Sequence, residues 1–146
     1  MSKAIYSPVQ IERIAMESVH FERSESALPR AEESYNYDIL LDVEVVRADP
    51  GEEGGKQSVV VTSLAVAWEE EPGPFELNVC YKAFVIHDGT VEQATFDKIC
   101  RLQIPTTILG FVRPFVARLM SEAGESFRLP LIDLRNQNAP ATEDET

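Results

Sequence analysis

The sequence predicts an α+β fold in which a four-stranded antiparallel sheet is followed by, and packed with, helices. Two observations lead to this prediction. Four segments with strand-like patterns follow one another with no helical pattern between them, which favours antiparallel pairing over a βαβ arrangement. After Asp88-Gly89 the spacing of apolar residues changes from two positions to the ~3.6 of a helix.

The predicted strands share β-branched or aromatic residues and span residues 8–22, 35–46, 58–68 and 75–86. The first alternates only partially, so we expect it to be irregular near its middle. The second alternates apolar with acidic positions, as a strand with one buried and one wet face does. The third is rich in β-branched residues, and the fourth alternates cleanly. Residues 23–34 are polar and proline-interrupted, which indicates a loop.

A first helix is predicted for residues 91–102, where apolar residues fall near helical spacing and Thr90 can cap the start. We expect Pro105 to interrupt the chain after it.

A second helix is predicted to begin at Thr106 or Thr107, either of which can cap it, and to end at Gly124. Pro114 lies inside this stretch, where we expect it to bend or delay the helix. A broad apolar stripe runs along the helix and consists of Ile108, Phe111, Val112, Phe115, Val116 and Leu119.

The chain of 146 residues is one domain's worth, and we place that domain in residues 1–134 and an acidic, disordered tail in 135–146. Acidic residues outnumber basic ones 25 to 13, for a net charge of −12. Such a surface repels phosphate backbones and anionic lipid, so no nucleic acid or membrane partner is expected, whereas basic polypeptides would be attracted. Solubility alone is the simpler explanation of the acidity.

The opening residues do not read as a secretory signal and no run is long enough to span a membrane, so we expect a cytoplasmic protein. Cys80 and Cys100, the two cysteines, cannot build a four-ligand zinc site by themselves. We expect both to be buried, small apolar residues in a reducing compartment.

The sequence offers no strong set of catalytic residues, and we expect no enzyme activity, cofactor or metal. His20 and His87 lie in different strands, and no phosphate-binding or nucleophile motif is present. The enzyme alternative is a hotdog-type acyl thioesterase, whose acid or base would come from Glu92, Asp97 or His87. That fold places most of its sheet after the helix, whereas here the helices come last.

Aromatic and apolar residues in the second half of the chain suit the binding of varied unfolded segments, because they give large contact areas with few rotors to freeze. For each of these residues taken singly, packing in the protein core is the alternative explanation. The predicted groove for a polypeptide consists of Tyr81, Phe84, Phe111, Phe115 and Leu119. A single helical layer on a four-stranded sheet leaves part of the apolar surface exposed to solvent. We therefore expect a homo-oligomer, either a dimer or a tetramer.

The helix motif ILGFVR at 108–113, the downstream Gly124 and the run LPLIDL at 129–134 resemble the SecB family of export chaperones. Residues 11–22 and 75–86 resemble that family's first and fourth strands. The resemblance implies an assembly of two dimers that holds non-native client polypeptides in hydrophobic grooves without ATP. SecB proteins deliver clients to the motor SecA, while SecB-like relatives protect an antitoxin.

Several positions depart from the family pattern. Gly110 and Phe111 stand where Pro and Tyr are usual, and the second, C-terminal helix of the family is missing. Of the three acidic positions that receive SecA in the family, only Glu22 is acidic here, because Ser18 and Asn78 occupy the other two. The resemblance therefore implies Glu22 as a contact for the translocase motor, disfavours the usual SecA docking, and leaves a chaperone dedicated to one client as the alternative.

Overall fold

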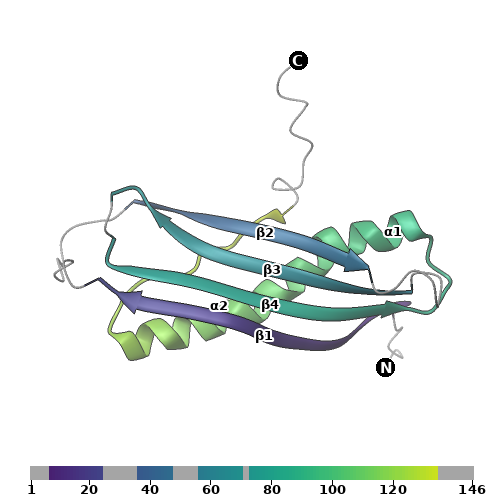
Figure 1. The fold of residues 1–146 in the computed structure, drawn as a ribbon, viewed down its shortest axis with the longest axis horizontal. Helices are drawn as coiled ribbons and strands as arrows, with labels where there is room; N and C mark the ends of the chain where they lie inside the picture. Colours follow the sequence, from purple (N-terminus) through teal and green to yellow (C-terminus); the bar gives the residue numbers. More distant parts are fainter. Residues whose placement is uncertain (1–6, 25–35, 48–55, 71–72, 135–146) are drawn as a thin grey trace, which may run out of the picture.

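The computed structural model describes residues 7–24, 36–47, 56–70 and 73–134, and it confirms the predicted α+β arrangement (Figure 1). Four strands come first, β1 (Val9–Arg23), β2 (Tyr37–Arg47), β3 (Gln57–Trp68) and β4 (Phe75–His87). They form one sheet in the order β1-β4-β3-β2, and all neighbouring pairs are antiparallel. The sheet therefore has β1 and β2 at its two edges.

The predicted irregularity of the first strand is confirmed. The β1–β4 register shifts between Ile11 and Arg13 and again between Met16 and Ser18. Such shifts are typical of β-bulges. Each bulge moves the strand by one position. As a result the apolar residues of β1 remain opposite buried residues of β4, although their spacing in the sequence is uneven; they are Val9, Ile11, Ile14, Met16, Val19 and Phe21.

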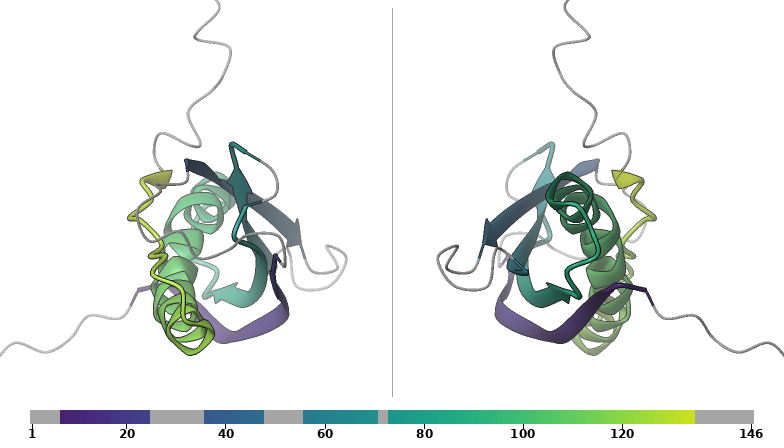
Figure 2. Two further views of the ribbon diagram at one scale, coloured as in Figure 1. Left: turned by 90° about the vertical axis from the view of Figure 1, so that its left-hand side faces the viewer. Right: turned by 90° about the vertical axis from the view of Figure 1, so that its right-hand side faces the viewer.

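Helices cover one face of the sheet and leave the other face bare (Figure 2). The core lies between the two layers. Alternate residues of β4 from Phe75 to Val85 point into it, together with Val60 and Leu64 of β3. The helical layer contributes Phe96, Cys100, Ile108, Val112, Val116 and Met120.

The helical region is one continuous run of α1 (Gln93–Lys98), a π-helical turn η1 (Ile99–Gln103) and α2 (Ile104–Ala123). The predicted break at Pro105 was wrong. Pro105 lies in the first turn of α2, and the π-helical turn comes just before it, where proline cannot continue the α-helical hydrogen bonds. The helix also continues past Pro114 to Ala123.

The predicted caps were wrong as well. The hydroxyl and N–H of Thr90 both donate to Asp88 Oδ1, at 2.5 and 2.9 Å. These hydrogen bonds lower the pKa of the exposed Asp88 carboxyl. The N-cap residue of α1 is Glu92. Thr106 and Thr107 lie inside the continuous run and donate to the carbonyls of residues four positions earlier.

The predicted end of the helix at Gly124 is confirmed. This residue adopts a left-handed conformation with φ of 77°, which a glycine reaches without strain. Residues 125–134, which we call the return segment, then run back along the helical layer towards β2 (Figure 1). The predicted tail at 135–146 lies outside the described residues.

Candidate functional site

The five predicted groove residues do not line one surface. Tyr81 is 7% exposed on the helix-covered face, where burial raises the pKa of its hydroxyl. Phe84 lies on the bare face, under the guanidinium of Arg13 at 4.6 Å from the ring centroid. These two lie on opposite faces because their positions in β4 differ by an odd number.

The three predicted groove residues of α2 lie along one stripe of the helix, four positions apart. Phe111 is 53% exposed, whereas Phe115 and Leu119 are half-buried against the core. The structure therefore brings the helix members together and separates them from the two strand members. A role of any of the five in binding a client stays a prediction.

A cleft lies between α2 and the return segment, and we call it the α2 cleft. Its walls are Thr106, Leu109, Gly110 and Arg113 on the helix and residues 129–132 on the segment. Its volume of about 160 Å³ is close to that of an apolar cavity that holds a benzene ring. A Cβ at Gly110 would meet nothing within 4 Å, so the glycine keeps this part of the cleft wide.

A large apolar side chain lies at the edge of the α2 cleft, where Leu131 is 83% exposed. Phe111 on the same helix is 53% exposed but does not line the cleft, because consecutive helix residues do not face the same way. Leu129, two positions before Leu131, is buried. In a regular extended chain these two leucines would share one face, but burial alternates only up to Leu129 and changes phase at Pro130. Leu131 therefore faces the surface, whereas Ile132 is half-buried.

The return segment is anchored to the rest of the fold at several points. The Arg113 guanidinium donates from Nε and Nη2 to the Leu129 carbonyl, at 3.4 and 3.3 Å. Phe127 packs edge-on against Tyr37, Trp68 and Phe75, with ring centroids 5.1, 6.4 and 5.5 Å away. These contacts fix the second wall of the α2 cleft.

The bare face of the sheet carries a shallow trough. Small and polar residues of the central strands form its floor, including Ser63, Ala65 and Cys80. Leu40 from the edge strand β2 borders it and is 56% exposed, and Val46 further along the same strand is 46% exposed. Apolar surface is therefore accessible on both layers of the described chain.

The candidate acid–base residues of the thioesterase alternative include His87 and Asp97. His87 is 8% exposed and packs against the Phe96 ring at 4.4 Å, while its Nδ1 accepts from the Gly89 N–H. Asp97 Oδ1 accepts from Gln93 on the same helix. In the described part of the chain, the one group of three or more histidine, cysteine or acidic side chains with converging ligand atoms does not include His87.

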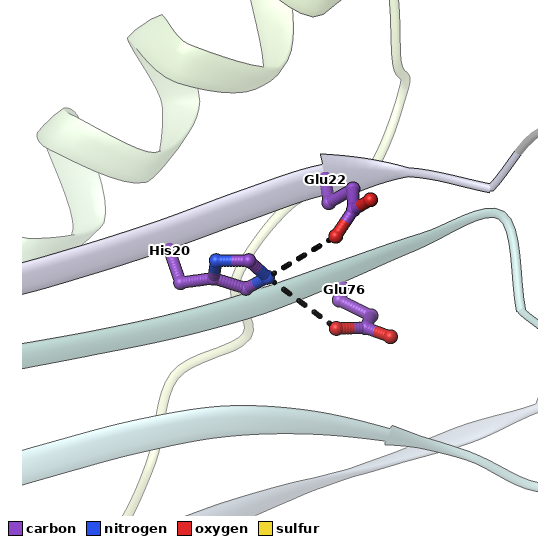
Figure 3. A group of neighbouring side chains, drawn as sticks. All are labelled: His20, Glu22 and Glu76. Carbon is purple, nitrogen blue, oxygen red and sulfur yellow. Dashed lines mark ion pairs between the residues drawn. The ribbon is translucent and has the colours of Figure 1, made fainter.

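That converging group consists of His20, Glu22 and Glu76 (Figure 3). Glu76 was missed by the sequence reasoning, because only the β1–β4 register places it beside residues that lie more than fifty positions earlier. Glu22, the predicted motor contact, is therefore part of a group on the bare face. Ser18 and Asn78 line the nearby trough.

The cysteines are both free, and Cys100 is fully buried while Cys80 is only half-buried. Burial raises the pKa of the Cys100 thiol to about 11, with a further contribution from the Asp97 carboxylate. No helix among the described residues is long and apolar enough to cross a membrane.

A solved structure shows the same fold. A SecB-like chaperone of Mycobacterium tuberculosis, in complex with a ChAD peptide from an antitoxin, matches with a TM-score of 0.66 at 13% sequence identity, over 86% of this chain and 88% of that one. The chain has the fold of a SecB-like chaperone. A protein of unknown function from Streptococcus agalactiae matches with a TM-score of 0.46 at 13% identity, over 84% of this chain and 96% of that one. No protein-family model matches the sequence, and no curated protein is significantly similar to it.

Proposed function

We propose that this protein is an ATP-independent holdase of the cytoplasm, which binds extended, partly apolar segments of non-native polypeptides. The observation that carries the proposal is the α2 cleft with Leu131 exposed at its edge, together with the exposed Phe111 elsewhere on the same helix. The fold adds support, because the SecB-like chaperone that shares it was solved with a bound peptide.

An apolar side chain of the client enters the α2 cleft and Leu131 covers its neighbour, while Phe111 offers a second apolar contact elsewhere on α2. Full burial of a large apolar side chain contributes about 1.5–3 kcal/mol, so covering the exposed half of Phe111 contributes about 1 kcal/mol. Burial of this kind is non-directional and does not require one client sequence. The net charge of −12 favours client segments that also carry basic residues.

Self-association belongs to the same proposal. Met16 and Val19 are 40% and 42% exposed on the edge strand β1. An edge strand with exposed apolar residues is a template for pairing with another chain. We therefore propose a homo-oligomer, a dimer or a tetramer, in which part of the exposed apolar surface is covered by sister chains.

The chaperone related in fold binds an antitoxin peptide, and a single dedicated client of that kind is our second candidate. Delivery to SecA for export is less favoured. Ser18 and Asn78 carry no charge, and the Glu22 carboxylate lies 3.6 Å from the His20 imidazole instead of standing alone. Pull-down from the native host separates the candidates, because a dedicated chaperone yields one stoichiometric protein and a general holdase yields many.

The test measures how far the protein suppresses the aggregation of a chemically denatured client at stoichiometric ratios. The wild type should suppress it, and the exposed substitutions Phe111→Ser and Leu131→Ser should each weaken client affinity about fivefold or more. Val46→Ser is the matched control, since it makes the same kind of change on the opposite face of the sheet. No suppression by a folded wild type across several clients would refute the proposal, and so would acyl-CoA hydrolysis that disappears in Asp97→Ala.

A further inference from the structure

His20, Glu22 and Glu76 meet at one end of the bare sheet face (Figure 3). His20 Nε2 lies 3.6 Å from Glu22 Oε1 and 3.4 Å from Glu76 Oε1. The three candidate ligand atoms all lie within 4.8 Å of one another. Each side chain is more than half exposed, so the group is open to ions from solution.

The β-sheet register creates an unfavourable pair at this point. Glu22 is the direct partner of Glu76 across the β1–β4 ladder. Like charges directly opposite one another destabilise a sheet, and this protein already carries a net charge of −12. Two carboxylates side by side therefore favour a cation between them.

Two basic side chains on the same pair of strands are engaged elsewhere. Lys82 Nζ lies 3.4 Å from Glu17, and the Arg23 guanidinium lies 2.9 Å from Glu125. His20 supplies one positive charge at most, and only when its ring is protonated. A divalent ion would neutralise both carboxylates and bind the neutral imidazole at the same time.

The spacing suits a transition-metal ion. Ligand bonds of about 2.0–2.2 Å in tetrahedral geometry place ligand atoms roughly 3.4 Å apart. The two distances from His20 Nε2, 3.4 and 3.6 Å, already match that separation. The two carboxylates need only a small side-chain rotation to complete the triangle, which their exposure permits. An imidazole ligand favours zinc and its neighbours over magnesium or calcium.

We propose that His20 Nε2, Glu22 and Glu76 form a binding site for one divalent transition-metal ion such as Zn²⁺. Three ligands from two paired strands leave at least one coordination position open towards solvent. No metal was predicted from the sequence. The proposed site goes beyond the holdase function and does not depend on it.

The experiment titrates Zn²⁺ into the full-length protein by calorimetry and records the visible absorption of the Co²⁺ form, both in excess Mg²⁺. We expect one ion per chain with micromolar affinity and a Co²⁺ spectrum that includes a nitrogen ligand. His20→Asn and Glu76→Gln should each weaken binding at least tenfold. Glu12→Gln, which removes an exposed acid of the same strand outside the group, should bind as the wild type does.

Two results would overturn the proposal. Absence of Zn²⁺ binding by the wild type in the micromolar range would leave the three residues as an ion-pair group only. Unchanged binding by His20→Asn would place the metal elsewhere, for instance on other acidic residues of the chain. Circular dichroism of each variant checks its fold, which substitutions at such exposed positions should preserve. Aggregation suppression by His20→Asn tests the holdase function separately and should be unchanged without metal.

Discussion

Gly73 should be intolerant of any side chain because it lies against the Trp68 ring. A Cβ at Gly73 would stand 2.1, 2.3 and 2.5 Å from three atoms of the indole, which is closer than any real contact. Gly73→Ala must therefore displace Trp68. The indole is not at the free end of a flexible chain, because its Nε1 donates to the Phe75 carbonyl at 2.7 Å and its ring packs edge-on against Tyr37, Phe75 and Phe127.

The magnitude follows from these contacts. A lost hydrogen bond costs about 1 kcal/mol, and each lost aromatic pair costs about 0.5–1.5 kcal/mol beyond its buried area. Partial loss of one hydrogen bond and three pairs gives a destabilisation of about 3 kcal/mol. For a domain of this size that corresponds to a fall of about 10 °C in Tm. Because Trp68 also contacts Phe127, the return segment should loosen, and client affinity should fall even though no residue of the α2 cleft has changed.

Urea unfolding followed by circular dichroism and by fluorescence tests this prediction, since Trp68 is the single tryptophan of the chain. Gly110→Ala is the matched control. A Cβ there meets nothing within 4 Å, and glycine is about 1 kcal/mol worse than alanine inside a helix, so this variant should be more stable than the wild type. Equal stability and unchanged tryptophan emission in Gly73→Ala would refute the packing described around Trp68.

Two further predictions concern the thiols and the return segment. At mildly alkaline pH a thiol reagent should modify the half-buried Cys80 in the native protein and should reach Cys100 only on unfolding. The reason is that burial keeps the Cys100 thiol inaccessible and raises its pKa to about 11. Fast modification of both cysteines in the folded protein would contradict this prediction. Arg113→Ala should remove the hydrogen bonds to the Leu129 carbonyl and increase proteolysis of the return segment. Arg118→Ala, at an exposed position of the same helix, is the control. Equal cleavage of the two variants would show that Arg113 does not hold the segment.

The strands could be predicted from the sequence because alternation records which face of each strand is buried. Even the irregular β1 was predictable, since its uneven apolar spacing is the trace that bulges leave. The start of the helical region and the connection between its two helices could not be predicted in this way. Pro105 carries a strong local signal for a break, but the π-helical turn before it lets the helical run continue. Thr90 carries a signal for a cap, but its hydroxyl donates to Asp88 instead.

The candidate sites depend on relations between distant residues, and single-sequence patterns record these poorly. Tyr81 and Phe84 are an exception, because strand parity alone places them on opposite faces and could have separated them from the sequence. His20 and Glu76 become neighbours only through the pairing of the first strand with the last.

The return segment links the remaining apolar surplus to function. Five of its residues are large and apolar: Phe127, Leu129, Leu131, Ile132 and Leu134. Burial alternates up to Leu129 and changes phase at Pro130, so Leu129 and Ile132 pack against the core and Leu131 between them is 83% exposed. A leucine in that position contributes nothing to the stability of the single chain and favours aggregation unless a partner covers it. If sister chains cover it, Leu131→Ser should lower the oligomer mass in dilute solution; if clients cover it, the mass should be unchanged and only client affinity should fall. The open α2 cleft beside Leu131 favours the second outcome, because a leucine reserved for a sister chain needs no vacant cleft next to it.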